Sequence, residues 1–549
     1  MNVAEAVGAA LAGLGVRRVF GVVGSGNFHV VNALVAGGAE FTAARHEAGA
    51  AVMADAYARV SGEVGVVSVH QGPGLTNALT GITEAAKSRT PLLVLAAETG
   101  AAAVRSNFRI DQAALAAGVG AVPERIHSAG SAAADLARAW RMAAEQRRTV
   151  VLNLPLDVQA AELPGPLALP AAARATVPAP TAEAVAALAD ALAAARRPVF
   201  VAGRGAQLSG AGPGLRRLAE RGGALLATSV MARGLFLGDP YDLDVSGGFA
   251  TPLAAELISG ADLLVGWGCG LTMWTLRHGR LVGQDTVVAQ VDADPAALGA
   301  HRPVDLAVTG DAAATAEAVA AELERRGHRT TGYRLPDLAD RLHREGRWRD
   351  IPYKDASTDE HIDPRTLSVL LDDLLPDERQ VAVDSGNFMG YPAVYLAVPD
   401  AGGLVFTQGF QSIGLGLASA IGTALARPDR LTVAALGDGG ALMGVAELET
   451  AVRLGLGMLI VVYDDAAYGA EVHHFGPGGH PLATVRFPDT DLAAIGRGFG
   501  CAGATVRRAE DLRVVRDWLA GPRERPLLLD AKVTADEPAW WLEEAFRGH

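Results

Sequence analysis

The most informative residues form a glycine-rich turn, Gly437-Asp438-Gly439-Gly440, between an expected strand and an expected helix over about 445–453. Such a turn offers bare backbone N–H groups and the positive end of a helix dipole, which suits a phosphate group. An aspartate there would repel phosphate unless a cation lay between them. The turn therefore indicates a diphosphate held through a metal ion, although Asp-Gly after a strand is also a common turn without any such function.

A second acidic strand end strengthens the metal interpretation. The next expected strand along the chain, 458–463, is followed directly by Asp464-Asp465. Because neighbouring parallel strands end side by side, Asp438 and Asp465 can share one hard cation. Oxygen ligands beside phosphate favour Mg²⁺ or Ca²⁺ over a softer metal.

Three turns near the start of the chain carry candidate catalytic groups. Ser25 and His70 lie in glycine-rich turns, and Glu47 opens an alanine-rich helix that runs to Arg59. Each has an ordinary structural explanation, because a glutamate in a first helical turn compensates the helix dipole and turn residues often satisfy local hydrogen bonds. Convergence of all three on one sheet edge would instead indicate a site.

Parallel sheets are needed to position these turns. Short apolar strands alternate with amphipathic helices along the chain, a pattern typical of parallel sheets covered on both faces. The expected strands are residues 19–23, 65–69, 91–96, 149–154, 198–202, 224–228, 263–266, 287–291, 380–384, 431–435, 458–463 and 527–533.

Two stretches interrupt this alternation. Residues 163–183 are dense in proline, and residues 325–364 are rich in charge with further prolines. Because proline disfavours helix interiors and sheet ladders, both stretches are interpreted as linkers. The fold class is therefore α/β, with three doubly wound parallel-sheet domains at 1–165, 183–325 and 360–549.

Composition limits the classes of function. Of the 549 residues 50% are apolar and 20% charged, and the net charge is −13, which disfavours nucleic acid or an anionic membrane as partner. Two cysteines exclude a disulfide framework and fit a reducing compartment. The start of the chain has no basic segment followed by an apolar core, and no apolar run has membrane-spanning length. We expect a cytoplasmic globular protein.

The Asp438 turn, its spacing to Asp465 and the Arg45-His46-Glu47 helix start together resemble the thiamine-diphosphate enzymes of the acetolactate synthase, pyruvate decarboxylase and benzoylformate decarboxylase superfamily. The resemblance covers essentially the whole chain. It implies a pyrimidine-binding first domain, a central Rossmann-like domain and a diphosphate-binding third domain. This chain has Asp464-Asp465 where the family usually has two asparagines.

The resemblance implies roles in binding and activating thiamine diphosphate. Glu47 matches the carboxylate that helps protonate the pyrimidine ring, Ile413 matches the aliphatic wedge between the two rings, and the Gln411 carbonyl matches the acceptor of the pyrimidine amino group. The ligands of Mg²⁺ match Asp438, Asp465 and the carbonyl of Ala467. The other matching cofactor contacts are Gly386, Asn387, Phe388, Gly437, Gly439, Gly440 and Tyr468.

Assembly and metal dependence follow from the same resemblance. In this family the cofactor bridges the first domain of one subunit and the third domain of another, which implies a homodimer, or a homotetramer of paired dimers, with active sites between subunits. The middle domain lacks a flavin signature, and Leu156 stands where acetolactate synthases have a lysine, so FAD is not expected. The extra charge of Asp465 predicts strict dependence on a divalent metal.

The residues that would handle substrate resemble more than one branch of the superfamily. Ser25 and His70 match residues of benzoylformate decarboxylases, and Glu471 matches an acid with which pyruvate and indolepyruvate decarboxylases move protons. Residues 72–77 and 299–307 look more like acetolactate synthases.

Three further side chains are candidate substrate contacts: Gln71, Arg109 and His473. The Arg109 guanidinium would suit a substrate carboxylate. Alternatively, Arg109 is a surface residue paired with Asp111. His473 could likewise be a solvated loop residue beside His474.

The function predicted from these residues is that of an acetolactate-synthase-like carboligase, which decarboxylates a small-molecule 2-oxo acid and joins the remaining fragment to a second carbonyl compound. The first alternative is a decarboxylase that releases an aldehyde, with His70 and Glu471 as proton carriers. A catalytically silent cofactor-binding homologue ranks lower, because Glu47 and Asp438 are both present. A nicotinamide-dependent reductase ranks lowest, because no strand ends in a full Gly-x-Gly-x-x-Gly turn.

Overall fold

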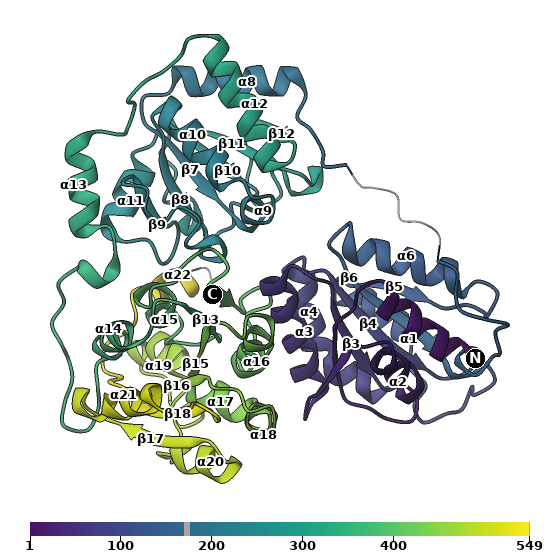
Figure 1. Cartoon of the computed structure of the whole chain (residues 1–549). Helices are drawn as coiled ribbons and strands as arrows, with labels where there is room; N and C mark the ends of the chain where they lie inside the picture. Colours follow the sequence, from purple (N-terminus) through teal and green to yellow (C-terminus); the bar gives the residue numbers. More distant parts are fainter. Residues whose placement is uncertain (170–175, 548–549) are drawn as a thin grey trace.

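The computed structural model describes residues 1–169 and 176–547, which form three six-stranded parallel sheets flanked by helices (Figure 1). This confirms the predicted fold class. In the first domain the strands are β1 Arg18–Gly21, β2 Glu40–Ala43, β3 Gly65–Val69, β4 Leu92–Glu98, β5 Val122–Arg125 and β6 Thr149–Pro155. Its helices are α1 Val3–Gly13, α2 Phe28–Ala36, α3 Glu47–Ser61, α4 Pro73–Lys87, α5 Gln112–Gly118, α6 Ala132–Ala144 and α7 Leu156–Gln159.

The central domain has a sheet of its own. Its strands are β7 Pro198–Ala202, β8 Leu225–Thr228, β9 Asp242–Val245, β10 Leu263–Trp267, β11 Val287–Asp292 and β12 Leu306–Thr309. Its helices are α8 Ala182–Ala194, α9 Arg204–Leu208, α10 Gly212–Gly222, α11 Pro252–Ser259 and α12 Ala312–Arg325. The strand order is β12-β11-β10-β7-β8-β9, so the direction of winding reverses between β7 and β10.

The third domain repeats the strand order of the first. Its strands are β13 Arg379–Val383, β14 Leu404–Phe406, β15 Leu431–Gly437, β16 Leu459–Asp464, β17 Ala502–Val506 and β18 Leu527–Lys532. Its helices are α14 Pro364–Leu374, α15 Gly390–Tyr395, α16 Gly416–Ala426, α17 Asp438–Met443, α18 Glu447–Arg453, α19 Gly469–Phe475, α20 Leu492–Phe499, α21 Arg513–Ala520 and α22 Leu542–Ala545. The order β2-β1-β3-β4-β6-β5 of the first sheet reappears as β14-β13-β15-β16-β18-β17.

The four interior strands of every sheet were predicted from the sequence, whereas the two edge strands of each sheet were not. The missed strands are β2, β5, β9, β12, β14 and β17. Interior strands are buried on both faces, so their sequences are continuous apolar runs. Most of the edge strands are partly exposed or charged and lack such a run. β14 is only three residues long, which is too short to form a pattern.

The two predicted linkers differ in outcome. Residues 170–175 of the first linker lie outside the described residues. Near the end of this linker, Thr181 is the N-cap of α8, and its side chain accepts a hydrogen bond from the Ala184 N–H. The second contains a helix that was not predicted, α13 Pro336–Glu345. Pro336 occupies the first helical turn, where its missing N–H costs nothing, and Leu338 and Leu342 are buried on one face.

The first and third domains share one hydrophobic core. Helices α3 and α16 lie side by side, and their buried small residues belong to a single cluster (Figure 1). A Cβ added at Gly422 would lie 2.1 Å from the carbonyl oxygen of Met53, so only glycine permits this approach of the two backbones. The domains are therefore locked in one relative position by close packing.

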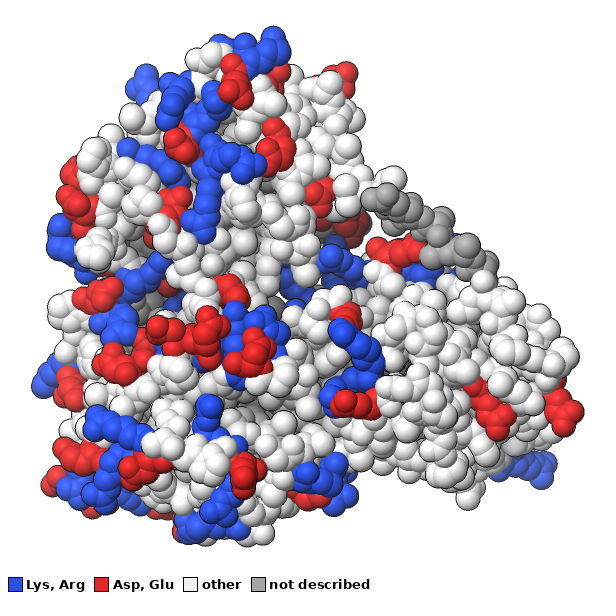
Figure 2. Space-filling view, viewed as in Figure 1, with Lys and Arg blue, Asp and Glu red and all other residues white. Residues whose placement is uncertain are grey.

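The surface matches the acidic, mixed composition. Basic and acidic side chains interleave over the central and third domains, and the visible face of the first domain is largely uncharged (Figure 2). Among the described residues, no helix is both long enough and apolar enough to cross a bilayer.

Candidate active site

The two predicted metal-binding carboxylates lie at neighbouring strand ends. β15 and β16 are paired in parallel with Gly437 opposite Tyr463, which places Asp438 beside the Asp464-Asp465 turn. Burial, and then the charges of Asp465 and Asp464, raise the pKa of Asp438 to about 8. Burial likewise raises the pKa of Asp465 to about 6. A divalent cation would favour the charged forms of both carboxylates, which burial and the neighbouring negative charges disfavour.

The turn after β15 becomes helical earlier than expected. The sequence predicted a helix from about Val445, but α17 begins at Asp438 itself and ends before Gly444, and α18 follows. Gly437 is the N-cap and has no side-chain partner for the free N–H groups. A Cβ added at Gly439 would lie 2.6 Å from the Tyr468 ring, so this turn has no room for a larger residue. The exposed N–H groups suit a diphosphate.

Asn387 completes this end of the site. Its Nδ2 donates to Asp465 Oδ2 at 3.2 Å, and its own Oδ1 is buried without a hydrogen-bond partner. Within the part of the chain that the structure describes, no group of three or more His, Cys, Asp or Glu side chains could hold a metal. A cation between Asp438 and Asp465 would therefore need oxygens from backbone carbonyls and from a ligand.

Asp464 belongs to a different cluster from Asp465. Its Oδ2 lies 2.6 Å from Nζ of buried Lys532, which also lies 2.5 Å from Asp489 Oδ1 and 3.2 Å from Asp530 Oδ2. Its Oδ1 accepts from the Ala466 N–H at 2.9 Å, and Ala466 is held at φ +50°. Asp464 therefore fixes the shape of the turn and its charge is balanced by Lys532.

A loop between β14 and α16 carries the other predicted cofactor contacts. Gln411 has φ +63°, a left-handed conformation that L residues rarely adopt. The far end of the loop is tied down by buried Asp384, which accepts from the N–H groups of Gly414 at 2.9 Å and Leu415 at 3.2 Å. Between these points lies Ile413.

Glu47 stands at the start of α3 in the first domain. Asn77 Nδ2 donates to Glu47 Oε2 at 3.0 Å. His46 is the N-cap of the helix, and its side chain accepts from the Ala48 N–H. The Glu47 side chain is half-buried in the single chain.

His70 lies close to Glu47. A Cβ added at Gly74 would lie 3.2 Å from His70 Cβ and 3.6 Å from Glu47 Oε1. His70 Nδ1 accepts from the Gly26 N–H at 3.1 Å, which places the proton of the neutral ring on Nε2. Burial, opposed by the charge of Glu47, holds the pKa of His70 below its ordinary value. The neutral ring can thus donate from Nε2.

The remaining candidates of the first domain surround His70. Ser25 is exposed in the turn that wraps the ring, and Gln71 is buried with its Oε1 unpartnered. The rings of Phe108 and His70 lie edge to face at 5.2 Å. Arg109, next to Phe108, is exposed.

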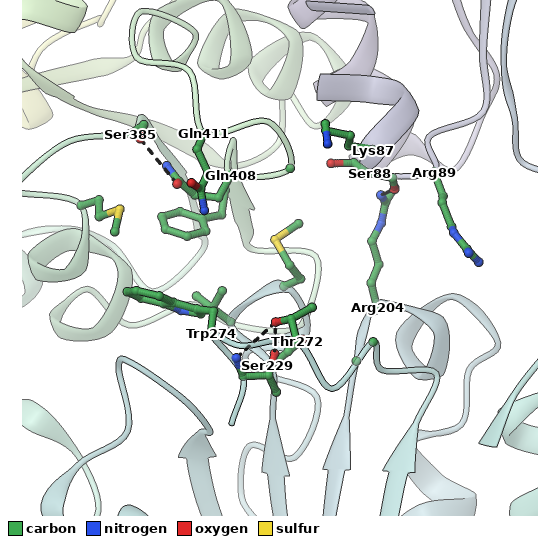
Figure 3. Close-up of a pocket in the computed structure, with 18 of the residues that line it drawn as sticks. Lys87, Ser88, Arg89, Arg204, Ser229, Thr272, Trp274, Ser385, Gln408 and Gln411 are labelled. Atoms are coloured by element: carbon green, nitrogen blue, oxygen red, sulfur yellow. Dashed lines mark hydrogen bonds between the residues drawn. The ribbon is translucent and has the colours of Figure 1, made fainter. Parts of the chain in front are cut away.

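A cavity of about 2170 Å³ lies between the three domains. Figure 3 shows the part of it where Arg204 of the central domain reaches the Ser88 carbonyl at the end of α4, across from Gln408 and Gln411. The predicted residues that line the cavity are Gly386, Asn387, Phe388, Gln411, Ile413, Gly437, Asp438, Gly439, Gly440, Asp465, Ala467, Tyr468 and Glu471. Those outside its lining are Ser25, Glu47, His70, Gln71, Arg109 and His473. One chain therefore brings the candidates together in two separate groups.

Four charged residues that hold these groups in place were not among the predicted site residues: Glu84, Asp384, Glu447 and Lys532. Glu84 and Glu447 bind backbone groups more than three hundred positions away, and Asp384 and Lys532 have partners 30 and 68 positions away. No pattern in the linear sequence marks such contacts.

The fold and its strand-end turns define a three-domain α/β protein with a large cavity between its domains, into which the turns after β15 and β16 face. Models of thiamine pyrophosphate enzymes match it in three parts: the N-terminal TPP binding domain at residues 1–115, the central domain at 185–319 and the C-terminal TPP binding domain at 384–531. The chain belongs to the thiamine pyrophosphate enzyme family. It is an enzyme that depends on thiamine diphosphate.

Curated relatives resemble the chain over nearly its whole length. A probable 2-ketoarginine decarboxylase of Pseudomonas aeruginosa is 32% identical over 525 residues, covering 93% of this chain and 90% of the relative. The catabolic acetolactate synthase of Raoultella terrigena is 29% identical, with 93% and 91% covered. The sulfoacetaldehyde acetyltransferase of Castellaniella defragrans is 27% identical, with 93% and 89% covered.

The residues present fit this cofactor. The carboxylate pair, the bare N–H groups after Gly437 and the unpartnered Asn387 Oδ1 form a polar end suited to a metal-bound diphosphate. The left-handed Gln411 and the neighbouring Ile413 lie on the loop beside it. The cavity therefore has a polar end and a less polar wall.

Proposed function

We propose that the chain is a thiamine-diphosphate- and Mg²⁺-dependent carboligase, which decarboxylates a 2-oxo acid and joins the remaining fragment to a second carbonyl compound. The observation that carries the proposal is the single cavity lined by every predicted cofactor contact of the third domain. The acetolactate synthase among the relatives supports the carboligase assignment.

When bound, thiamine diphosphate supplies the electron sink for the decarboxylation of a 2-oxo acid. Asp438, Asp465 and the Ala467 carbonyl would hold Mg²⁺ against the diphosphate. The Gln411 carbonyl would accept from the pyrimidine amino group, and Ile413 would pack between the rings. Glu47 would hold a proton at the pyrimidine nitrogen.

The substrate would lie between the two groups of candidate residues. His70 Nε2–H would donate to the substrate oxygen, with Ser25 and Gln71 beside it. Arg109 would pair with a carboxylate, and Glu471 and His473 would move protons on the opposite side. Burial, partly opposed by Asp536, lowers the pKa of His473, which favours its neutral form.

Assembly as a homodimer would complete the site, because Glu47 lies outside the cavity that holds Asp438. A second copy would bring its first domain to the open side of the cavity, and two such dimers could pair into a tetramer. A cytoplasmic location fits the two cysteines, which are both free.

A decarboxylase that releases an aldehyde is the second candidate. The probable 2-ketoarginine decarboxylase among the relatives favours it, as does His70 with its donor at Nε2. The two candidates differ in whether a proton or a second carbonyl compound takes the fragment.

The test is CO₂ release in the presence of thiamine diphosphate and Mg²⁺, with pyruvate and 2-ketoarginine as separate substrates and with the organic product identified in the same reaction. Acetolactate from pyruvate would support the carboligase, whereas an aldehyde from either substrate would support the decarboxylase. Glu47→Gln is the control, and it should abolish release. Cofactor binding without any CO₂ release from a wider panel of 2-oxo acids would contradict both candidates.

A further inference from the structure

Glu84 of the first domain binds the backbone of the third-domain loop that carries Gln411. The Glu84 side chain is completely buried in α4. Its Oε1 accepts from the Gly409 N–H at 3.1 Å, and its Oε2 accepts from the Phe410 N–H at 2.7 Å. In Figure 3 this loop runs beside the end of α4 at Lys87 and Ser88.

Arg59 supports this contact. Its guanidinium donates to Glu84 Oε1 at 2.8 Å and to Asp55 Oδ1 at 3.0 Å, and also to the Phe406 carbonyl at 3.1 Å. Burial alone would raise the pKa of Glu84, but Arg59 and the two backbone donors outweigh it and hold the pKa below its ordinary value. Glu84 is therefore a charged acceptor.

Glu447 of the third domain makes the reverse contact. It is buried in α18, and its Oε1 accepts from the N–H groups of both Arg45 and His46 at 3.0 Å. Its Oε2 accepts from the Thr450 hydroxyl at 2.7 Å. The two bound N–H groups directly precede Glu47.

The two contacts occupy equivalent places in the two domains. Glu84 lies on the helix after the third strand of its domain, and Glu447 lies on a helix after the third strand of the other. Each receives two consecutive N–H groups from the segment after the second strand of the opposite domain. The shared strand order of the two sheets makes the pair reciprocal.

We propose that Glu84 and Glu447 are positioning residues, each of which fixes the cofactor-facing segment of the opposite domain. Glu84 sets the entry of the loop that presents Gln411 and Ile413, whose exit is set by Asp384. Glu447 fixes the backbone of Arg45 and His46, and with it the position and direction of the start of α3, where Glu47 lies. The inference rests on the proposed function, because it takes Glu47, Gln411 and Ile413 to act on thiamine diphosphate.

The two glutamates bind their N–H groups through different numbers of carboxylate oxygens. We therefore expect them to respond differently to replacement by glutamine. Both N–H groups at Glu447 are received by one oxygen, which a glutamine can supply. The N–H groups at Glu84 are received by two oxygens, and a glutamine would turn an N–H₂ group towards one donor. Glu447→Gln should therefore be tolerated, whereas Glu84→Gln and Glu447→Ala should displace their segments.

The experiment measures exchange of the C2 proton of bound thiamine diphosphate with deuterium in the full-length holoenzyme, together with kcat, KM and cofactor Kd. Glu84→Gln and Glu447→Ala should slow exchange and kcat by about tenfold to a hundredfold, since small misplacements of acting groups have effects of that size. Glu447→Gln should stay within about twofold of the parent because it keeps the oxygen acceptor. KM should change little.

Glu449→Gln is the matched control, because Glu449 lies on the same helix and pairs with the Arg45 side chain but with no backbone N–H of that segment. Thermal unfolding of each variant shows whether a slower exchange comes from a displaced segment or from loss of the fold. If Glu84→Gln does not fold, Glu84→Asp takes its place. Parental exchange rates in folded Glu84→Gln, Glu84→Asp and Glu447→Ala would overturn the positioning role alone. Failure of the parent chain to bind the cofactor would overturn the proposed function, and this role with it.

Discussion

His70 is the residue whose protonation the structure constrains most directly. Its Nδ1 is occupied by the Gly26 N–H, so a second proton can enter only by breaking that hydrogen bond. Burial also lowers its pKa from the ordinary value of 6.5. The side chain is thus neutral over the neutral pH range and has one defined donor.

We expect kcat/KM to be flat above pH 6.5 and to fall as the pH drops through the lowered pKa values of His70 and His473. His70→Gln should reduce kcat/KM by about 10²- to 10⁴-fold, the usual range for a residue that transfers protons. The pH profile of kcat/KM checks both expectations, with His29→Gln on the exposed face of α2 as control. If the kcat/KM of His70→Gln fell at the same acidic pH as that of the parent, the fall would be due to another group.

Asp465 makes a second prediction at this scale. At pH 8.5 and without a cation, the charged carboxylates of Asp465 and Asp438 would both face the diphosphate, so a chelator should abolish cofactor binding at that pH. Asp465→Asn removes one charge and should tighten metal-free binding of thiamine diphosphate by at least about tenfold, given the strength of charge repulsion at short range. Titration calorimetry with chelator and with MgCl₂ measures this, with Asp517→Asn on the surface as control. Equal binding by the parent with and without chelator would contradict it.

Among the elements, β16 and β18 lie in a register that pairs buried Lys532 with the turn proposed to bind the metal. Asp464 and Lys532 lie opposite each other, and Lys532 is the shared partner of Asp464, Asp489 and Asp530. Asp464 in turn holds the Ala466 N–H. The shape of the turn therefore depends on a residue of the next strand.

Lys532→Met should lower the free energy of unfolding by about 3–5 kcal/mol, because it leaves Asp464 buried without its counter-ion. The same variant should weaken Mg²⁺ binding at the turn. Lys532→Met with Asp464→Asn should recover part of both losses, since removing both partners leaves no unpaired charge between them. Urea unfolding measures the free energy of unfolding of each variant, and titration measures its affinity for Mg²⁺. Lys354→Met, at an exposed lysine, is the control. Equal stability of the single and double variants would contradict the pairing.

The same elements show how much the sequence could predict. Apolar patterning located the interior strands, and the glycines with Asp438 and Glu47 located the strand-end turns, because these signals are local. Edge strands such as β2 and β17 face solvent on one side and lose the continuous pattern. The contacts of Glu84 and Glu447 join residues more than three hundred positions apart, and only the packing of α3 on α16 brings them together.

At the scale of the whole molecule, the two groups of candidate residues lie on separate domains and do not share a cavity in one chain. The proposed homodimer brings Glu47 of one copy to Asp438 of the other. Each dimer would then contain two sites, and each site would draw on both copies.

Co-expression of Glu47→Gln chains with Asp438→Asn chains tests this arrangement. Either variant alone should be inactive. A mixed dimer has one site with both substitutions and one site with neither, so random pairing should restore about a quarter of the parental activity. Separately purified variants mixed under conditions without subunit exchange are the control. Activity that stays at the level of the single variants, despite mixed dimers in the sample, would place the whole site within one chain.

The buried carboxylate contacts between the first and third domains have a consequence for ionic strength. Salt screens charges through the surrounding solvent, over about 8 Å at physiological concentration, and has little effect on groups that solvent does not reach. Glu84 and Glu447 are shielded in this way, whereas surface pairs such as Arg45 with Glu449 are open to dissolved ions. The contact between these two domains should therefore persist in concentrated salt that screens the outer ion pairs.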